Sequence, residues 1–259
     1  MKKICFVVLA FLSCAAIAGA QDFRSMFGTD QKGSLSYGVR AGYNVSNFYG
    51  HVFYGGKKES LGENISPFSG GHIYGIVDIP VTNGFYIQSG LGFSSKGSAE
   101  KYKDVQKSDG YYSRDVDLYA EVPFYLEIPV LASFRADVAR NVNLQVGVGP
   151  YFAVAVGGRS YDIDNGSGWD RNDGERWHWH DVESSPMFSK DGNRGISRFD
   201  TGLTFTAGVT LFRHYYAGIS YDIGLNNIMN RKALAQLIEA GGAAYMHNGT
   251  FSISVGYTF

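Results

Sequence analysis

The C-terminal ten residues, TFSISVGYTF (250–259), alternate strictly between two kinds of side chain. Phe251, Ile253, Val255, Tyr257 and Phe259 are apolar or aromatic, and each residue between them is Ser, Gly or Thr. Successive side chains of a β-strand point to opposite faces, so the segment predicts a strand with one apolar and one small polar face. A slip of one residue would exchange the faces, which specifies the register strongly.

Seven further segments show the same period of two. With the last one, the predicted strands span 34–45, 71–80, 85–95, 117–135, 141–156, 199–212, 215–225 and 250–259. Short turns, one of them the hairpin signal Asn83-Gly84, alternate with long polar connections at 46–70, 96–116, 157–198 and 226–249. This spacing predicts an all-β protein, an eight-stranded antiparallel up-and-down transmembrane β-barrel over 34–259, with short periplasmic turns and long extracellular loops.

Alternation alone does not say which face is inside, because a soluble eight-stranded ligand-carrying barrel has the same period with its faces reversed. The lysines favour the membrane barrel. All nine lysines after residue 20 lie outside the predicted strands, whereas a water-facing strand surface would carry several. The polar face, rich in Gly, Ser, Thr, Asn and Tyr, suits a narrow interior, and the apolar face suits lipid.

Composition narrows the class of protein further. The 259 residues include 34 Gly, 18 Tyr and 18 Phe, and the formal net charge is -1. Outside the extreme N-terminus there is no run of about 18 apolar residues, which argues against a helical membrane protein. The near-neutral charge offers no basic stripe for nucleic acid, so we expect no nucleic-acid partner.

The first twenty residues have the features of a signal peptide. Lys2 and Lys3 precede an apolar stretch, and Ala18-Gly19-Ala20 forms a small-residue cleavage site. We expect removal of 1–20, a periplasmic N-terminal lead at 21–33, and localisation in the outer membrane. An alternative makes Cys14 a lipidation site. Both cysteines of the chain lie in this segment, so a mature chain has no thiol for a disulfide.

Four stretches resemble a known family. They are GVRAGYNVS (38–46), YLEIPVL (125–131), GVGPYF (147–152) and YDIGL (221–225), of which YLEIP is the most specific. They look like the outer-membrane β-barrel (porin-like, PorT-type) proteins of Bacteroidetes, and the resemblance covers essentially the whole mature chain. It implies an eight-stranded barrel in the outer membrane, and it implies no transported substrate.

The inward face is expected to carry a polar network. An eight-stranded barrel is just wide enough to be filled by side chains, and buried charges must be paired. The network can be an ion-paired plug or a narrow cation or proton path. Its predicted members are Arg40, Asp78, Glu121, Glu127, Asp200 and Asp222, with His72, Gln88 and Arg135 on the same face.

The connection 157–198 carries the candidate sites outside the barrel. Asp162, Asp164 and Asp170 lie in a stretch loosely similar to a calcium loop, with a solvated acidic loop as the alternative. His178 and His180 have the i, i+2 spacing of a Zn, Cu or haem contact, which an aromatic hairpin also produces. All three tryptophans, Trp169, Trp177 and Trp179, are in this connection and suggest a recognition patch for glycan or protein. In the last connection, 232–240 predicts a short helix near the barrel mouth.

The sequence indicates a protein without enzymatic activity. It contains no Ser/His/Asp order, no phosphate-binding Gly loop and no HExxH motif, and we expect no cofactor. An omptin-like or acyl-transfer barrel is the enzymatic alternative. The favoured function is structural or surface recognition through the long loops; the alternatives are a narrow porin-like channel or a component of an export machine. Expected partners are outer-membrane lipid and lipopolysaccharide, with an extracellular ligand or a periplasmic protein as a further partner. We expect the protein to be a monomer.

Overall fold

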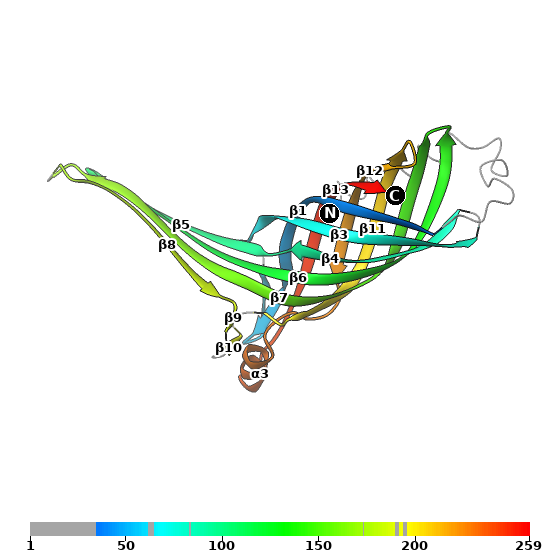
Figure 1. The fold of residues 1–259 in the computed structure, drawn as a ribbon. Coiled ribbons are helices and arrows are strands. Elements are labelled where there is room, and N and C mark those ends of the chain that lie inside the picture. Colours follow the sequence, from blue (N-terminus) through cyan, green and yellow to red (C-terminus); the bar gives the residue numbers. More distant parts are fainter. Residues whose placement is uncertain (1–34, 62–64, 83, 173, 190–191, 194–195) are drawn as a thin grey trace.

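A computed structural model describes residues 35–61, 65–82, 84–172, 174–189, 192–193 and 196–259 (Figure 1). The predicted signal peptide, 1–20, and lead, 21–33, lie outside these residues. The described chain is almost entirely β-strand, and none of its helices has the length and apolar character needed to cross a membrane.

Eight strands form a closed ring. Each strand is antiparallel to the next one in the chain, and the last pairs with the first, so the ring has no free edge. The predicted eight-stranded up-and-down fold is thereby confirmed. The ring strands are β1 (Ser36–Tyr54), β3 (Ile65–Thr82), β4 (Phe85–Ser95), β6 (Tyr111–Ala139), β7 (Val142–Asp170), β11 (Phe199–Leu211), β12 (Tyr215–Gly224) and β13 (Ala243–Thr258).

The outer surface of the ring is apolar and its interior is polar, the reverse of a soluble protein. Phe93 and Val255 are 56% and 63% exposed, whereas Gln88 and Asp200 are 1% and 0% exposed. The alternating residues therefore face as the sequence predicts, with the apolar set toward lipid. Ring closure and the lipid-facing exterior exclude the soluble barrel with reversed faces.

The two ends of the ring differ. Short turns lie at one end, where Gly84 adopts a φ of +76° beside the β3–β4 turn and the Phe259 backbone N–H donates to the Tyr37 carbonyl oxygen at 2.8 Å. The long connections lie at the other end, where β2 (Lys57–Leu61) extends the β1 hairpin.

Two of the long connections are not loops. The structure continues β6 and β7 to 29 residues each and adds β5 (Ser98–Ser108) and β8 (Arg176–Pro186) beside them. We call this four-stranded extension, residues 98–121 and 158–186, the arm; Figure 1 shows it projecting far beyond the ring. The prediction of polar loops at 96–116 and 157–198 was wrong here, because a sheet that meets water on both faces lacks an apolar period.

The remaining elements lie near the mouth of the ring (Figure 1). They are the short strands β9 (Phe188–Ser189) and β10 (Gly192–Asn193) and the helix α3 (Arg231–Glu239). The Asn230 side chain begins the helix by accepting the Lys232 backbone N–H at 2.8 Å, and Gly241 follows its end with a φ of +79°. The predicted helix at 232–240 is confirmed, although most of its side chains are exposed.

Candidate functional site: the closed lumen and the charged arm

Between β4 and β5 the strand is interrupted at Lys96 and Gly97, and this interruption, called the β4–β5 break below, directs Lys96 into the lumen. The Ser46 hydroxyl fixes this break, because it donates to the Gly97 carbonyl oxygen (3.0 Å) and accepts the Gly97 N–H (2.7 Å). A Cβ at Gly97 would approach the Glu121 carbonyl oxygen to 2.3 Å, so glycine is required here. The side chain of Lys96, just before it, is completely buried.

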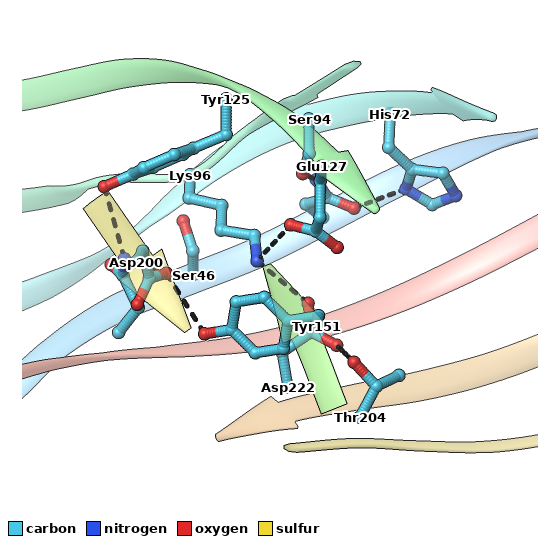
Figure 2. Close-up of polar contacts among 12 residues, drawn as sticks. Ser46, His72, Ser94, Lys96, Tyr125, Glu127, Tyr151, Asp200, Thr204 and Asp222 are labelled. Carbon is cyan, nitrogen blue, oxygen red and sulfur yellow. Dashed lines mark hydrogen bonds and ion pairs between the residues drawn. The ribbon is translucent and has the colours of Figure 1, made fainter. Parts of the chain in front are cut away.

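The Lys96 ammonium lies between two carboxylates inside the ring (Figure 2). Its Nζ is 2.7 Å from Glu127 Oε2, 3.1 Å from Asp222 Oδ2, and 4.3 Å from the centre of the Tyr151 ring. Ion pairs and an aromatic face together replace the water that the charge has lost. We call Lys96, Glu127, Asp222, Tyr151 and Asp200 the Lys96 cluster.

The second oxygen of each paired carboxylate is also engaged. The Tyr74 hydroxyl donates to Glu127 Oε1 at 2.8 Å, and the Thr204 hydroxyl donates to Asp222 Oδ1 at 2.8 Å. Both carboxylates therefore join strands across the lumen, and both are already occupied by groups of the protein. This is the arrangement of a structural plug.

Asp200 is the third carboxyl group of the cluster. The Tyr151 hydroxyl (3.1 Å) and the Asn248 side-chain amide (2.7 Å) both donate to its Oδ2 (Figure 2). The Asn248 amide also reaches the Tyr125 hydroxyl at 3.4 Å. The cluster thus joins three carboxyl groups and one ammonium across four strands, β6, β7, β11 and β12, and the β4–β5 break.

A second polar cluster closes the lumen nearer the short turns. Arg135 Nη2 is 2.5 Å from Asp78 Oδ2, and Gln88 donates to Asp78 Oδ1 at 2.6 Å. Arg40 donates to Gln88 Oε1 at 3.0 Å, and its guanidinium lies 3.7 Å from the centre of the Tyr216 ring. We call these five residues the Arg135 cluster.

A small cavity separates the two clusters. Its volume is about 60 Å³, and its lining includes Arg40 and Gln88 on one side and His72, Glu127 and Asp222 on the other. Such a polar space has room for a few water molecules. The cavity thus lies between the two polar clusters.

Apolar side chains close the mouth above the Lys96 cluster. Phe48, Met187, Ile196 and Ile228 are 0–4% exposed and form one cluster, against which Phe188 packs. Backbone hydrogen bonds hold it in place, with the Ser197 N–H donating to the Ile228 carbonyl oxygen at 2.6 Å. The mouth is covered by the segments that precede β11 and α3.

The structure brings together most, but not all, of the predicted lumen residues. It places Arg40 and Asp78 in the Arg135 cluster and Glu127, Asp200 and Asp222 in the Lys96 cluster. Glu121 is placed differently: it lies at the base of the arm, outside both clusters, and among the described residues its side chain makes no hydrogen bond or ion pair. The sequence analysis missed Lys96. Because Lys96 lies two residues after the inward-facing Ser94, the alternation of the strand places its side chain on the inward face as well.

The arm has two faces of opposite charge. The register places every carboxylate of its four strands on one face, which continues the lumen wall, and every Lys and Arg on the other, which continues the lipid-facing wall. The acidic face carries Glu100, Asp104, Asp115, Asp117, Glu121, Asp162, Asp164, Asp170, Asp181 and Glu183. The basic face carries Lys101, Lys103, Lys107, Arg114, Arg159 and Arg176, with His178 and His180.

Like charges stand directly opposite one another on the acidic face. Asp164 pairs in register with Asp117 on one side and Asp181 on the other, and Asp162 pairs with Glu183. Such cross-strand pairs destabilise a sheet. Near the base, burial and, secondarily, the Glu100 carboxylate raise the pKa of Glu121 to about 7.

The candidate metal ligands are divided between the two faces. Asp162, Asp164 and Asp170 lie on the acidic face, whereas His178 and His180 lie on the basic face, where His180 hydrogen-bonds Asn165. Within the described residues no group of three or more His, Cys, Asp or Glu side chains is placed to hold a metal ion. The aspartates of the calcium-like stretch and the two histidines are thus on opposite faces of the arm.

The tryptophans are divided in the same way. Trp177 and Trp179 lie on the acidic face, where they pair in register with Gly168 and Gly166 of the neighbouring strand. Trp169 lies on the basic face. The expected single patch is therefore corrected to a pair and one separate side chain. Trp177 also lies 5.8 Å from the Tyr111 ring, between ring centres, near the arm tip.

Several solved structures are similar to this chain. Ail, the attachment invasion locus protein of Yersinia pestis, is 14% identical, covering 88% of this chain and 100% of that one, with a TM-score of 0.30. Neisserial surface protein A is 12% identical, covering 88% and 100%, with a TM-score of 0.31. OprG from Pseudomonas aeruginosa is 12% identical, covering 89% and 99%, with a TM-score of 0.38. No curated protein matches the chain.

A closed ring of eight strands with an apolar exterior and a polar lumen defines a transmembrane β-barrel. The model of one family, the outer membrane protein β-barrel domain, matches residues 20–230. The chain belongs to this family, and it is a protein of the outer membrane.

Proposed function

We propose that the protein is a non-conducting, non-enzymatic barrel that serves in recognition at the cell surface through its arm. The observation that carries this proposal is the contrast between the two parts of the molecule. The lumen is filled by two polar clusters and covered by an apolar one, while the arm is exposed, with its charges sorted onto two faces.

The acidic face supports a cationic ligand. Its carboxylates repel one another across the strands, and a partner that brings positive charge would offset this repulsion. Trp177 and Trp179 stand on the same face and add aromatic contact surface of the kind that interfaces use. The proposed ligand is a basic segment of an extracellular polypeptide.

Two further observations support the remaining parts of the proposal. The Glu127 and Asp222 carboxylates are engaged by Lys96 and by hydroxyl groups, which supports a structural rather than a catalytic role. The stretches at 38–46, 125–131, 147–152 and 221–225 support a narrower placement among the PorT-type barrels of Bacteroidetes.

Binding of a labelled oligolysine peptide to the mature full-length chain in lipid nanodiscs tests the proposed ligand class. We expect saturable binding that weakens roughly tenfold or more in a variant with Asp115→Asn, Asp164→Asn and Asp181→Asn. The matched control, Lys101→Gln with Lys103→Gln, keeps the acidic face intact and should bind as the wild type does. Equal binding by the acidic-face variant contradicts the proposal.

A narrow channel for small ions is the second candidate function. The cavity of about 60 Å³ between the clusters supports it, because a rearrangement of Arg40 or Lys96 could join this space to either end. Ion conductance of the reconstituted chain separates the two functions. A role in an export machine would use residues 21–33, which lie outside the described residues.

A further inference from the structure

The basic face of the arm is the direct continuation of the surface that faces lipid. On β6 and β7 the outward side chains of the ring include Phe124, Phe152 and Val156, all exposed. Two residues beyond Phe124, the register brings Arg159 opposite Val122 on this outward face. At about 3.3 Å per residue, the first positive charge lies only about 7 Å along the strand from Phe124, directly beyond the apolar wall of the ring.

The positive charge then continues outward along β5, beside an apolar stripe. Lys101 and Lys103 on β5 lie opposite Leu118 and Val116 of β6, and Ile163 of β7 extends the stripe. The Lys and Arg side chains of this face are exposed, and no ion pair with a carboxylate is recorded for any of them in the described part of the chain. An apolar centre with unpaired cations at its edges fits an amphiphile that carries anionic groups.

We propose that the basic face binds the phosphate groups of the glycolipid that forms the outer leaflet around the barrel. The acidic face, being on the opposite side of the same strands, would be turned away from this anionic surface. The arm would thus be held at the leaflet by one face and leave the other free. This inference is independent of the cationic ligand proposed above, because it rests on different residues and a different chemistry.

Trp169 provides a reporter for the proposed contact. It is the tryptophan of the basic face, so Trp177→Phe with Trp179→Phe leaves it as the single emitter. The mature full-length chain with these two changes is titrated, in detergent micelles, with bis-phosphorylated lipid A. We expect a saturable change of Trp169 emission, and none with lipid A from which both phosphates have been removed.

A charge-neutralised variant tests which residues bind. Lys101→Gln, Lys103→Gln, Lys107→Gln and Arg114→Gln remove four charges from β5 and β6. Each basic residue near an anionic surface contributes roughly a fivefold factor, so we expect binding at least roughly a hundredfold weaker. The matched control carries Glu100→Gln, Asp104→Asn, Asp115→Asn and Asp117→Asn on the same two strands, and it should bind at least as well as the parent chain.

Two checks keep the test decisive. Heat-modifiable migration on electrophoresis identifies the variants that fold, and Lys101→Arg with Lys103→Arg, which preserves charge, should retain binding if the glutamine variant does not fold. Binding of the glutamine variant within roughly threefold of the parent, or equal binding of the dephosphorylated lipid, overturns the proposal. Absence of oligolysine binding by the parent chain, with its lipid A binding retained, would overturn the proposed cationic ligand and leave this inference standing.

Discussion

Replacement of Lys96 by Met removes the only cation from the Lys96 cluster while keeping a side chain of similar length. Glu127 and Asp222, which lie 2.7 and 3.1 Å from the ammonium, would remain buried without their ionic partner. Removing one partner of a buried ion pair typically costs about 3–5 kcal/mol. Because one ammonium serves two carboxylates that join different strands, we expect Lys96→Met to lower the free energy of unfolding by about that amount.

Urea unfolding of the mature chain in lipid vesicles, followed by far-ultraviolet circular dichroism of the strands, measures this change. The matched control is Lys101→Met, an exposed lysine five residues further on, which should alter the free energy of unfolding by less than about 0.5 kcal/mol. Adding Glu127→Gln and Asp222→Asn to Lys96→Met removes the unpaired charges and should recover much of the loss. A Lys96→Met protein as stable as the wild type would refute the assignment of Lys96 as the centre of the plug.

Three further predictions concern single residues. At alkaline pH we expect Glu121→Gln to be more stable than the wild type by up to about 3 kcal/mol. A pKa of about 7 in the folded state makes the wild type lose stability as pH rises from about 4.5 to about 7. The difference in stability between the two proteins should vanish at pH about 4, and a difference that does not change with pH contradicts the prediction. Ser46→Ala leaves the Gly97 N–H and carbonyl oxygen without their partner and should cost about 1–3 kcal/mol in the same urea assay, whereas an unchanged midpoint would show that the break is held by other contacts. Asp164→Asn removes the middle charge of a row of three and should slow amide hydrogen exchange across 160–170, less so at high salt; faster exchange would disprove the repulsion.

The ring was predictable from sequence because its two faces meet different solvents. Lipid outside and a packed lumen inside require apolar residues at every second position, as in Phe199, Leu203 and Phe205 against Asp200 and Thr204. That requirement predicted the number of strands and the face of each side chain. The ends of the strands were less predictable, since β1 continues to Tyr54 through a stretch, 47–54, in which apolar and polar residues no longer alternate.

The arm was missed because neither of its faces is dry. Its period of two is present as an alternation of charge, as in Glu100, Lys101, Tyr102, Lys103 and Asp104, and a search for apolar alternation does not detect it. Lys96 was missed for a related reason. It directly follows the end of the predicted strand 85–95, so the alternation was not followed as far as residue 96, although a position two residues after Ser94 predicts the inward face.

Ion conductance of the mature full-length chain in planar lipid bilayers tests the central claim most directly, with heat-modifiable migration on electrophoresis to show that the barrel is folded. The two polar clusters and the apolar residues at the mouth predict a folded barrel without discrete openings at moderate voltage. Discrete openings of the wild-type chain, altered in size or ion selectivity by Lys96→Met, would contradict a closed lumen and support the channel.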